Sequence, residues 1–583
     1  MARNHLQQLR KRKRPALRVR QQILKLFGCN RVQYGQVPLA KRKKCPQAKF
    51  RRIRRISLGP DILVERRHRS TRLFQRVPNA PCPHQFAVRQ VRQDLAHTPF
   101  ARRSRRIHLP GCHAAKQRLQ LRRRGLHDLR RVAAFQVTRI GVHANTVSRV
   151  KVIEVTELHS ETQANSRRAL WQIFTAAFVV RVLYILLAHT FKVRPSDDHF
   201  EFGWEMGRIG RSLATGHGYS DPFTGHTGPT AWVPPGYTLL VGGIFRIFGV
   251  YSKLSAFVLL TFNSLLSALT AVFCYEIGLR CFNRRVALWS GWLWALYPAA
   301  MQYAVRWIWE MTATTCIFTA LLVLMLRMRG IGDKERSEPT WQQWAAFGLL
   351  WGVLAMVNPS PLIMLPVTAL YILFAPRWQT KRLAHAALAG VLFLAVIAPW
   401  TARNYAVFHR FIPLRDNFGA ENYQGNSDWS TGFPWGRTVP LENHQILAEY
   451  ARMGEPAWAA DRAAKANAWI KTHPVRFMKL SMKRAWMYWM GVPKSVEEAG
   501  VLEYFRLMSF QFLSLCGIFG AVLAVQRRKP AAWVFLSAFL LLPLPYYLVT
   551  VQARFRHTLE PLICILGVYL FQSAARRNET ATQ

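Results

Sequence analysis

The sequence is poor in negative charge: its 583 residues hold 29 Asp+Glu against 81 Lys+Arg, a formal net charge of +52. It also lacks paired cysteines, because none of its nine cysteines form a CxxC spacing, so it carries no zinc signature. It has no Walker-type glycine loop, so the sequence gives no support for ATP-driven transport. Apolar residues make up 50% of the chain, and an ordinary soluble fold is therefore a poor starting assumption.

The N-terminal part is the most basic, since residues 1–150 contain 39 Lys+Arg and 4 Asp+Glu. It has no apolar stretch long enough to cross a bilayer and no sustained hydrophobic period. We predict a disordered basic segment over residues 1–165. A mis-assigned translation start is an alternative, because no methionine occurs between Met1 and Met206. A basic arm that binds nucleic acid or anionic lipid is another, although our predicted partners include no nucleic acid.

The remainder contains long apolar windows, and a membrane crossing needs about 20 mainly apolar residues. A shorter segment, Pro235–Tyr251, carries Arg246 and either crosses the membrane or lies along its surface. We therefore predict an all-α polytopic membrane protein with about 10–11 transmembrane helices. The windows lie near 169–190, 254–279, 286–304, 311–326, 341–357, 360–375, 383–400, 505–525, 531–549 and 558–575.

Loop charge orients these helices, because basic loops favour the cytoplasmic side. The segments LRCFNRR, RMRGIGDKER, PRWQTKR, QRRKP and AARRN follow alternate helices and are expected inside. We divide the chain into a leader (1–165), a transmembrane module (166–400) with an outer loop (191–234), an extracytoplasmic insertion (401–503), and C-terminal helices with a short tail (504–583). The predicted location is the inner (plasma) membrane, with the active face extracytoplasmic.

The first outer loop concentrates carboxylates. Ser196 can cap a helix, and Asp197, Glu201 and Glu205 then follow at spacings of four, with Asp198 three before Glu201. In one helix these side chains share a face. Clustered carboxylates repel one another, which raises their pKa and suits a general base.

A purely structural interpretation of these acids also stands. The two aspartates would complement the helix dipole in its first turn, and Glu205 would pair with Arg208 across one turn. After the helix, glycines and prolines give a turn-rich return to the membrane that ends in Pro234 and Pro235.

Several motifs occur in a fixed order: the acidic pair after the first predicted helix, GHGYSDPF, GPTAWVPPGYTLLVGGIFRIFG, PWTARNYAVFHRFIPLRDNFGAENYQGN and QARFRHTLEPLI. In this order and spacing the chain resembles the bacterial GT-C glycosyltransferases, the superfamily of dolichyl-phosphate-mannose protein mannosyltransferases and aminoarabinose transferases. The resemblance covers about residues 169–575.

The resemblance implies a sugar transfer, normally with inversion, from a polyprenyl-phosphate donor to a glycan, lipid or protein acceptor outside the cytoplasm. It implies that Asp197 and Asp198 match the family's two acidic positions, with Glu201 and Glu205 as further catalytic candidates, and that Pro234 and Pro235 shape the loop. Many relatives have Asp-Glu in place of the Asp-Asp pair, and several have Lys at the position of Val233. Which carboxylate is the base therefore stays open. No cofactor is required, and a divalent metal is possible.

The leaving phosphate needs cationic donors at the membrane boundary. Arg403, Arg554, Arg556 and His557 each follow or precede a predicted helix at its outer end and are our candidates. The alternative for each is anchoring at lipid headgroups. Arg181 stands inside the first predicted helix, where an unpaired charge is costly and marks a candidate functional residue. The structural alternative, of equal weight, is that it pairs with Glu276 or Glu310, or reaches the interface.

A different class of function is a carrier or flippase for a lipid-linked sugar. A transporter is expected to place charged residues along a central path between helices. Here the acids concentrate in one outer loop, which favours the enzyme.

Overall fold

The computed structural model describes residues 166–193, 200–333, 338–374, 380–432, 438–440, 443–492 and 501–581. These residues belong to one compact unit, Lys116–Gln583. The leader predicted over 1–165 lies outside the described residues.

Regular structure in the described part is helical, apart from one isolated bridge between Ser220 and Pro229. This confirms the all-α prediction. After the helix Ser166–Ala188, the chain forms η2 (Phe200–Phe202), α4 (Glu205–Ala214), α5 (Pro235–Phe248), α6 (Lys253–Cys281), α7 (Arg284–Leu296), α8 (Pro298–Val305), α9 (Met311–Met328), α10 (Trp341–Val357), η3 (Ser360–Met364), α11 (Leu365–Leu373), α12 (Lys381–Phe408), α13 (Phe418–Gly425), α14 (His444–Met453), α15 (Glu455–Thr472), α16 (Pro474–Met490), α17 (Val501–Gln526), α18 (Ala532–Leu541), α19 (Leu544–Leu548), η5 (Ala553–Arg556) and α20 (Glu560–Ala581).

Local sequence accounts for where several of these helices begin. The side chains of Ser252, Asn283 and Thr340 each accept a hydrogen bond from the backbone N–H three residues later. Such caps satisfy amide groups that have no partner within the helix. Polar residues at these three positions therefore set the starts of α6, α7 and α10.

Five helices of the described part are long and apolar enough to cross a membrane: Ser166–Ala188, α6, α9, α12 and Tyr504–Gln526 within α17. The predicted windows all coincide with helices, but several of the others are shorter or interrupted. The window 286–304, for example, is divided between α7 and α8 at Pro298. The segment Pro235–Tyr251 forms α5, whose 14 residues extend about 21 Å, less than the hydrocarbon thickness of about 30 Å.

The helices pack closely where small residues meet. Gly348 of α10 faces the backbone of Ala389 in α12, where an added Cβ would lie 2.1 Å from the Ala389 carbonyl oxygen. One turn later an added Cβ at Gly352 would lie 2.7 Å from Val396. Glycine at both positions lets the two backbones approach, as is common between membrane helices.

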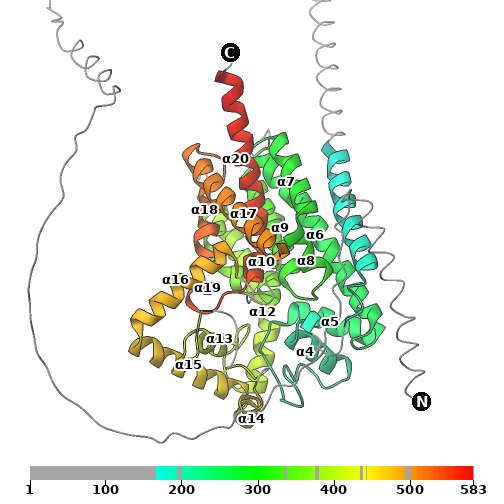
Figure 1. Ribbon diagram of the computed structural model, residues 1–583, viewed down its shortest axis with the longest axis vertical. Helices are drawn as coiled ribbons and strands as arrows, with labels where there is room; N and C mark the ends of the chain where they lie inside the picture. Colours follow the sequence, from blue (N-terminus) through cyan, green and yellow to red (C-terminus); the bar gives the residue numbers. More distant parts are fainter. Residues whose placement is uncertain are drawn as a thin grey trace, which may run out of the picture. The chain divides into compact units, whose positions relative to one another are not determined.

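The loops gather at two ends of the helical bundle. At one end Arg280 donates to the Ile331 carbonyl and to Asp333, at 2.7 and 2.9 Å, and the ring of Phe282 stacks on that of Tyr569. These contacts join loops that sequence analysis grouped as basic. In Figure 1 the C-terminal end of α20 lies at the top, and α4 and α13–α15 lie at the bottom.

Arg181 has partners that the sequence did not predict. Its guanidinium donates to the carbonyls of Ala177, Ala295 and Trp294, at 2.9, 2.8 and 3.2 Å. The residue four positions after Trp294 is Pro298, which has no N–H to give to that carbonyl. Arg181 therefore satisfies the last carbonyls of α7, and the predicted pairing with Glu276 or Glu310 is wrong.

We expect Gly348→Ala to destabilise the bundle by about 1–3 kcal/mol, because the new methyl group forces α10 and α12 apart. The matched control is Gly390→Ala in α12, where an added Cβ has open space and alanine favours the helix. Thermal unfolding of the detergent-solubilised protein measures both. Equal Tm values for the two variants would contradict this account of the packing.

Candidate functional site

The described part of the first outer loop is two short helices separated by a reversal. Gly203 and Trp204 have φ angles of 76° and 44°, between η2 and the first residue of α4. The prediction of a single helix carrying Glu201 and Glu205 on one face is therefore wrong. Glycine fits this reversal, because it adopts positive φ readily and because an added Cβ at Gly203 would lie 2.6 Å from Cδ1 of Trp309.

The same segment is fixed to the second outer turn. The amide of Ile308 donates to the carbonyl of Glu201 at 2.7 Å. This bond and the close approach of Gly203 place the start of α4 beside Trp309 and Glu310. Residues a hundred positions apart thus share one end of the bundle.

Three carboxylates from different elements face one arginine. Glu205 begins α4, Glu310 precedes α9, and Glu421 lies in α13. Each interacts electrostatically with Arg554 of η5. The guanidinium carbon of Arg554 lies 3.7 Å from the ring centroid of Trp309, a cation–π contact. We call Glu205, Glu310, Glu421 and Arg554 the acidic cluster; all four are partly buried.

Burial sets the proton affinity of this cluster. It raises the pKa of Glu205 to about 7, and the neighbouring Glu421 and Glu310 add to the rise while Arg554 opposes it. Burial likewise raises the pKa of Glu310 and Glu421, and it lowers that of Arg554. A carboxylate that titrates near neutral pH is suited to accept a proton in a reaction.

Two predicted acids lie outside the described residues: Asp197 and Asp198, which stand three and two positions before Phe200 in the chain. Glu201 is described. Its Oε2 atom is buried without a hydrogen-bond partner among the described residues. A buried carboxylate oxygen in that condition is costly and is a common feature of functional sites.

Arg403 holds the loop in place. Its guanidinium donates to the carbonyls of Thr230 and Tyr219, at 2.8 and 2.9 Å, and to the side chain of Asn404 at 3.0 Å. Its guanidinium carbon lies 5.0 Å from the ring centroid of Trp400. These partners occupy three of the five guanidinium N–H groups and fix Arg403 against the loop, and the predicted phosphate contact stays a prediction.

Arg556 and His557 belong to a different, fully buried group. Arg556 donates to Glu560 at 3.2 Å and also contacts the hydroxyl of Ser514. His557 contacts the other carboxylate oxygen of Glu560 at 3.1 Å. Of the four predicted phosphate ligands, the structure therefore brings only Arg554 together with the acids of the outer loop.

The two predicted scaffold prolines start α5. Pro235 is its first residue, where the missing N–H costs nothing, and Pro234 is extended with ψ of 152°. The next residue, Gly236, touches α10: an added Cβ would lie 2.8 Å from the Met356 carbonyl oxygen. The prolines thus direct the chain from the loop onto the bundle.

A buried carboxylate joins this loop to the insertion. Glu455, at the start of α15, accepts hydrogen bonds from the Thr230 hydroxyl, the Ala231 amide and the Tyr450 hydroxyl, at 2.5, 2.6 and 2.7 Å. The Asp416 amide in turn donates to the Ala231 carbonyl at 2.9 Å. Burial raises the pKa of Glu455 to about 7.

Three charged residues at or beside the acidic cluster were not identified from the sequence: Glu310, Glu421 and Arg415. Glu310 was considered only as a partner for Arg181, and Glu421 and Arg415 were not singled out. Arg415 counters the raised pKa of both Glu310 and Glu421. A usable signal existed: Glu310 is an acid beside Trp307 and Trp309 in an outer turn, and the other two lie within a quoted motif.

Metal ligation has no support in the part of the chain that the structure describes, where no three His, Cys, Asp or Glu side chains are grouped to hold an ion. Asp197 and Asp198 lie outside that part of the chain. No step proposed below passes through a metal.

Replacing Arg403 should loosen the loop. We expect Arg403→Gln to increase amide hydrogen exchange at least about tenfold in residues 217–231, because two charge-assisted bonds to backbone carbonyls are lost. The matched control is Arg410→Gln, whose exposed side chain donates only to the Pro456 carbonyl at 3.2 Å. Unchanged exchange in Arg403→Gln would show that this arginine does not hold the loop.

Comparisons with known proteins agree with the helical architecture. Residues 232–402 match the family model described as dolichyl-phosphate-mannose-protein mannosyltransferase. No curated protein matches. Among solved structures, the archaeal oligosaccharyltransferase AglB from Archaeoglobus fulgidus, in complex with an inhibitory peptide and a dolichol-phosphate, is 14% identical, with 65% of this chain and 47% of that chain covered and a TM-score of 0.37.

A second solved structure is ArnT from Cupriavidus metallidurans bound to undecaprenyl phosphate. It is 12% identical, with 64% of this chain and 74% of that chain covered and a TM-score of 0.30. The aligned part of our chain spans about half the length of the archaeal enzyme, 47%. The family match falls mainly on the predicted transmembrane module and confirms the resemblance to GT-C glycosyltransferases.

Proposed function

We propose that this GT-C-like membrane chain transfers a hexose or pentose from a polyprenyl-phosphate donor to a glycan, lipid or protein acceptor. The observation that carries the proposal is the acidic cluster, in which three partly buried carboxylates from distant segments interact electrostatically with Arg554. Proton acceptors and a cation at one end of a membrane bundle are the groups that such a transfer needs.

The choice of donor rests on Arg554 and on the relatives. A phosphate gains negative charge as it leaves, and an arginine held beside it stabilises that charge. The description of the matching family names a dolichyl-phosphate-linked sugar, mannose, as the group transferred. The two solved structures contain dolichol-phosphate and undecaprenyl phosphate. A lipid-linked phosphate also suits a site at the end of membrane-spanning helices.

The proposed reaction is a single displacement. The acceptor hydroxyl oxygen attacks the anomeric carbon from the face opposite the phosphate, and the carbon–oxygen bond to the phosphate breaks with its electron pair. A carboxylate takes the hydroxyl proton. The attack from the opposite face inverts the anomeric centre, as in glycoside chemistry. The candidates for this base are Asp197, Asp198, Glu201 and Glu205.

The raised pKa values of the glutamates also favour binding of the anionic donor, because protonated glutamates do not repel it. Three ionised carboxylates would repel an anionic phosphate. With a pKa of about 7, Glu205 is protonated in part of the molecules at neutral pH. The cluster therefore carries less negative charge than its composition suggests, and Arg554 stays attractive to a phosphate.

We place this site on the extracytoplasmic face of the inner membrane. Helices α4 and α13, which carry two acids of the cluster, lie toward the end of the bundle opposite the C-terminal end of α20, where the basic segment AARRN begins (Figure 1). Basic loops favour the cytoplasmic side, so the cluster would face outward. The gathering of its acids at one end also favours an enzyme over a carrier, which needs charged groups along its path.

Removing the cation or the base should lower transfer in isolated membranes supplied with labelled polyprenyl-phosphate sugar. We expect Arg554→Gln to lower the rate about 10²–10³-fold, as for a lost transition-state donor. Replacing the true base, tested as Asp197→Asn, Asp198→Asn, Glu201→Gln and Glu205→Gln, should lower it about 10²–10⁴-fold.

The control for both is Asp461→Asn, an acid on α15 that pairs with Lys465 at 2.8 Å and is not among the carboxylates that interact with Arg554. It should transfer sugar at the wild-type rate. If all four acid variants and Arg554→Gln match it, the site is wrong. If the wild type and all variants translocate the lipid-linked sugar but none of them transfers it to an acceptor, the protein is a carrier and the proposed enzyme activity is wrong.

The pH dependence tests Glu205 separately. If its carboxylate is the base, kcat/KM rises with pH through about 7, the pKa of Glu205, because only the deprotonated form accepts a proton. Glu205→Gln should then remove this rise from the residual activity. Glu455→Gln should keep the midpoint, although Glu455 has a similar pKa of about 7. A midpoint that follows Glu455 would contradict the assignment.

A further inference from the structure

Helix α16 has an apolar face that no described residue covers. Four large side chains are each more than half exposed: Val475 67%, Met478 58%, Met482 65% and Trp486 65%. Their spacings of three, four and four residues place them along one stripe of the helix. The opposite face is buried, and includes Leu480, Arg484, Met487 and Tyr488.

A row of cations borders this stripe on one side. Arg476, Lys479 and Lys483 are exposed and stand one position after Val475, Met478 and Met482 along the sequence. The Lys483 ammonium donates one hydrogen bond to the Thr431 carbonyl at 2.8 Å. A one-residue step turns the helix by about 100°. The helix therefore has three faces: one packed on the protein, one apolar and exposed, and one basic between them.

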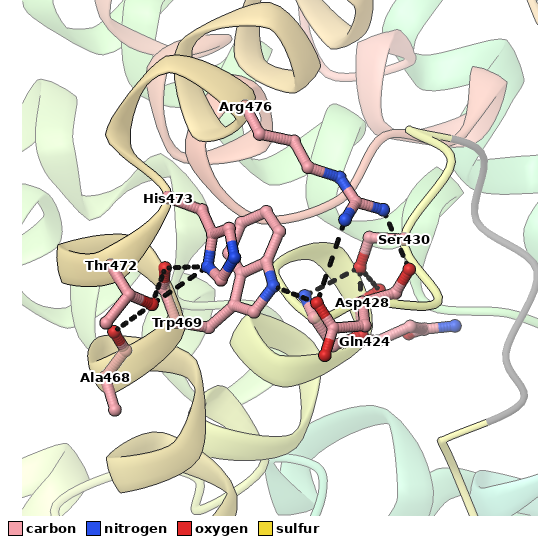
Figure 2. Close-up of polar contacts among 9 residues, drawn as sticks. Gln424, Asp428, Ser430, Ala468, Trp469, Thr472, His473 and Arg476 are labelled. Carbon is pink, nitrogen blue, oxygen red and sulfur yellow. Dashed lines mark hydrogen bonds and ion pairs between the residues drawn. The ribbon is translucent and has the colours of Figure 1, made fainter. Parts of the chain in front are cut away.

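The helix is held in this orientation from both ends. Figure 2 shows Arg476 against Asp428, whose carbonyl accepts its hydrogen bond at 2.8 Å. Asp428 also accepts from the indole of Trp469 at 2.8 Å, and His473 stacks on that indole with centroids 5.1 Å apart. Further along, Arg484 donates to the Tyr547 and Leu548 carbonyls at 3.1 and 2.9 Å. The apolar stripe therefore cannot turn inward without breaking these bonds.

The neighbouring helix α17 also exposes large apolar side chains. In α17, Phe505, Met508 and Phe512 are 66%, 65% and 56% exposed, and Tyr504–Gln526 is a candidate membrane span. A groove of about 210 Å³ lies between the two helices, lined by Lys483, Trp486, Met487, Met490, Gly491, Leu507 and Gln511. Its lining is apolar except for a cation and an amide.

We propose that α16 lies in the bilayer interface and binds anionic phospholipid, with its apolar stripe among the acyl chains. Lys479 and Lys483 would contact headgroup phosphates, and the groove between α16 and α17 would receive an acyl chain. An apolar stripe bordered by cations is the pattern of interfacial helices, and basic residues at that depth are attracted to anionic lipids.

The exposed apolar side chains of the neighbouring helix α17 favour lipid over a protein as the partner of α16. A protein docked on α16 alone would leave the adjoining apolar face of α17 to the bilayer, whereas a membrane covers both without a boundary. With 17 residues and four basic side chains, α16 is also a poor membrane span. The proposal concerns the membrane contact of the chain and is independent of the reaction proposed above.

The test uses the full chain reconstituted in nanodiscs. The four cysteines in residues 1–165 are replaced by serine, and the described cysteines are buried. A fluorophore is placed at Met482→Cys, and the unsubstituted parent serves as blank. We expect nitroxide-bearing lipids to quench this label at least about threefold more than one at Lys465→Cys, because only position 482 meets acyl chains. Equal quenching at both positions, or stronger quenching of position 482 by aqueous iodide, would overturn the proposal.

Lipid charge is tested on the same discs. Wild-type protein should retain at least about twofold more phosphatidylglycerol after detergent extraction than Lys479→Gln/Lys483→Gln, since headgroup attraction scales with nearby cations. The control is Lys465→Gln/Arg410→Gln, which removes two cations elsewhere and should retain the wild-type amount. If the double variants are alike, or if polyprenyl phosphate is retained and phosphatidylglycerol is not, the surface does not bind bulk anionic lipid and the proposal fails.

Discussion

The attraction between Arg554 and three carboxylates is the interaction on which this architecture depends. A guanidinium at that depth is costly to bury without compensation, and Glu205, Glu310 and Glu421 supply it. These glutamates come from α4, from the turn before α9 and from α13. The arginine of η5 therefore interacts electrostatically with three segments that lie far apart in the sequence. The same arrangement leaves a cation and several proton acceptors side by side.

Two further contacts keep those segments in place. Arg403 reaches from the end of α12 to the carbonyls of Thr230 and Tyr219, and Glu455 reaches from α15 to Thr230 and Ala231. Both contacts end on the backbone of one short stretch of the first outer loop. The insertion is thereby joined to the loop that carries the predicted acidic pair.

Helices were predictable because a membrane imposes one strong rule, a long apolar run with its backbone bonds satisfied internally. Each window that this rule predicted coincides with a helix in the structure. The rule did not predict where helices are interrupted, as at Pro298 between α7 and α8, because such breaks depend on local residues. The reversal at Gly203 and Trp204 was not predictable, because it follows from the approach of Trp309, a residue distant in the sequence. The same holds for Arg181 and Arg403, whose partners are backbone carbonyls and leave no sequence pattern. Glu310 and Glu421 were missed for a related reason, since only the fold brings them to Arg554.

The central claim is that the acidic cluster receives the phosphate of a lipid-linked donor at Arg554. An experimental structure of the full chain in a lipid nanodisc with a bound polyprenyl phosphate tests it most directly. The account predicts a phosphate oxygen within hydrogen-bond distance of the Arg554 guanidinium, about 3 Å, with Glu205 and Glu310 on the side where the sugar and acceptor would lie. A phosphate bound elsewhere, with Arg554 still facing only its carboxylates, would contradict it.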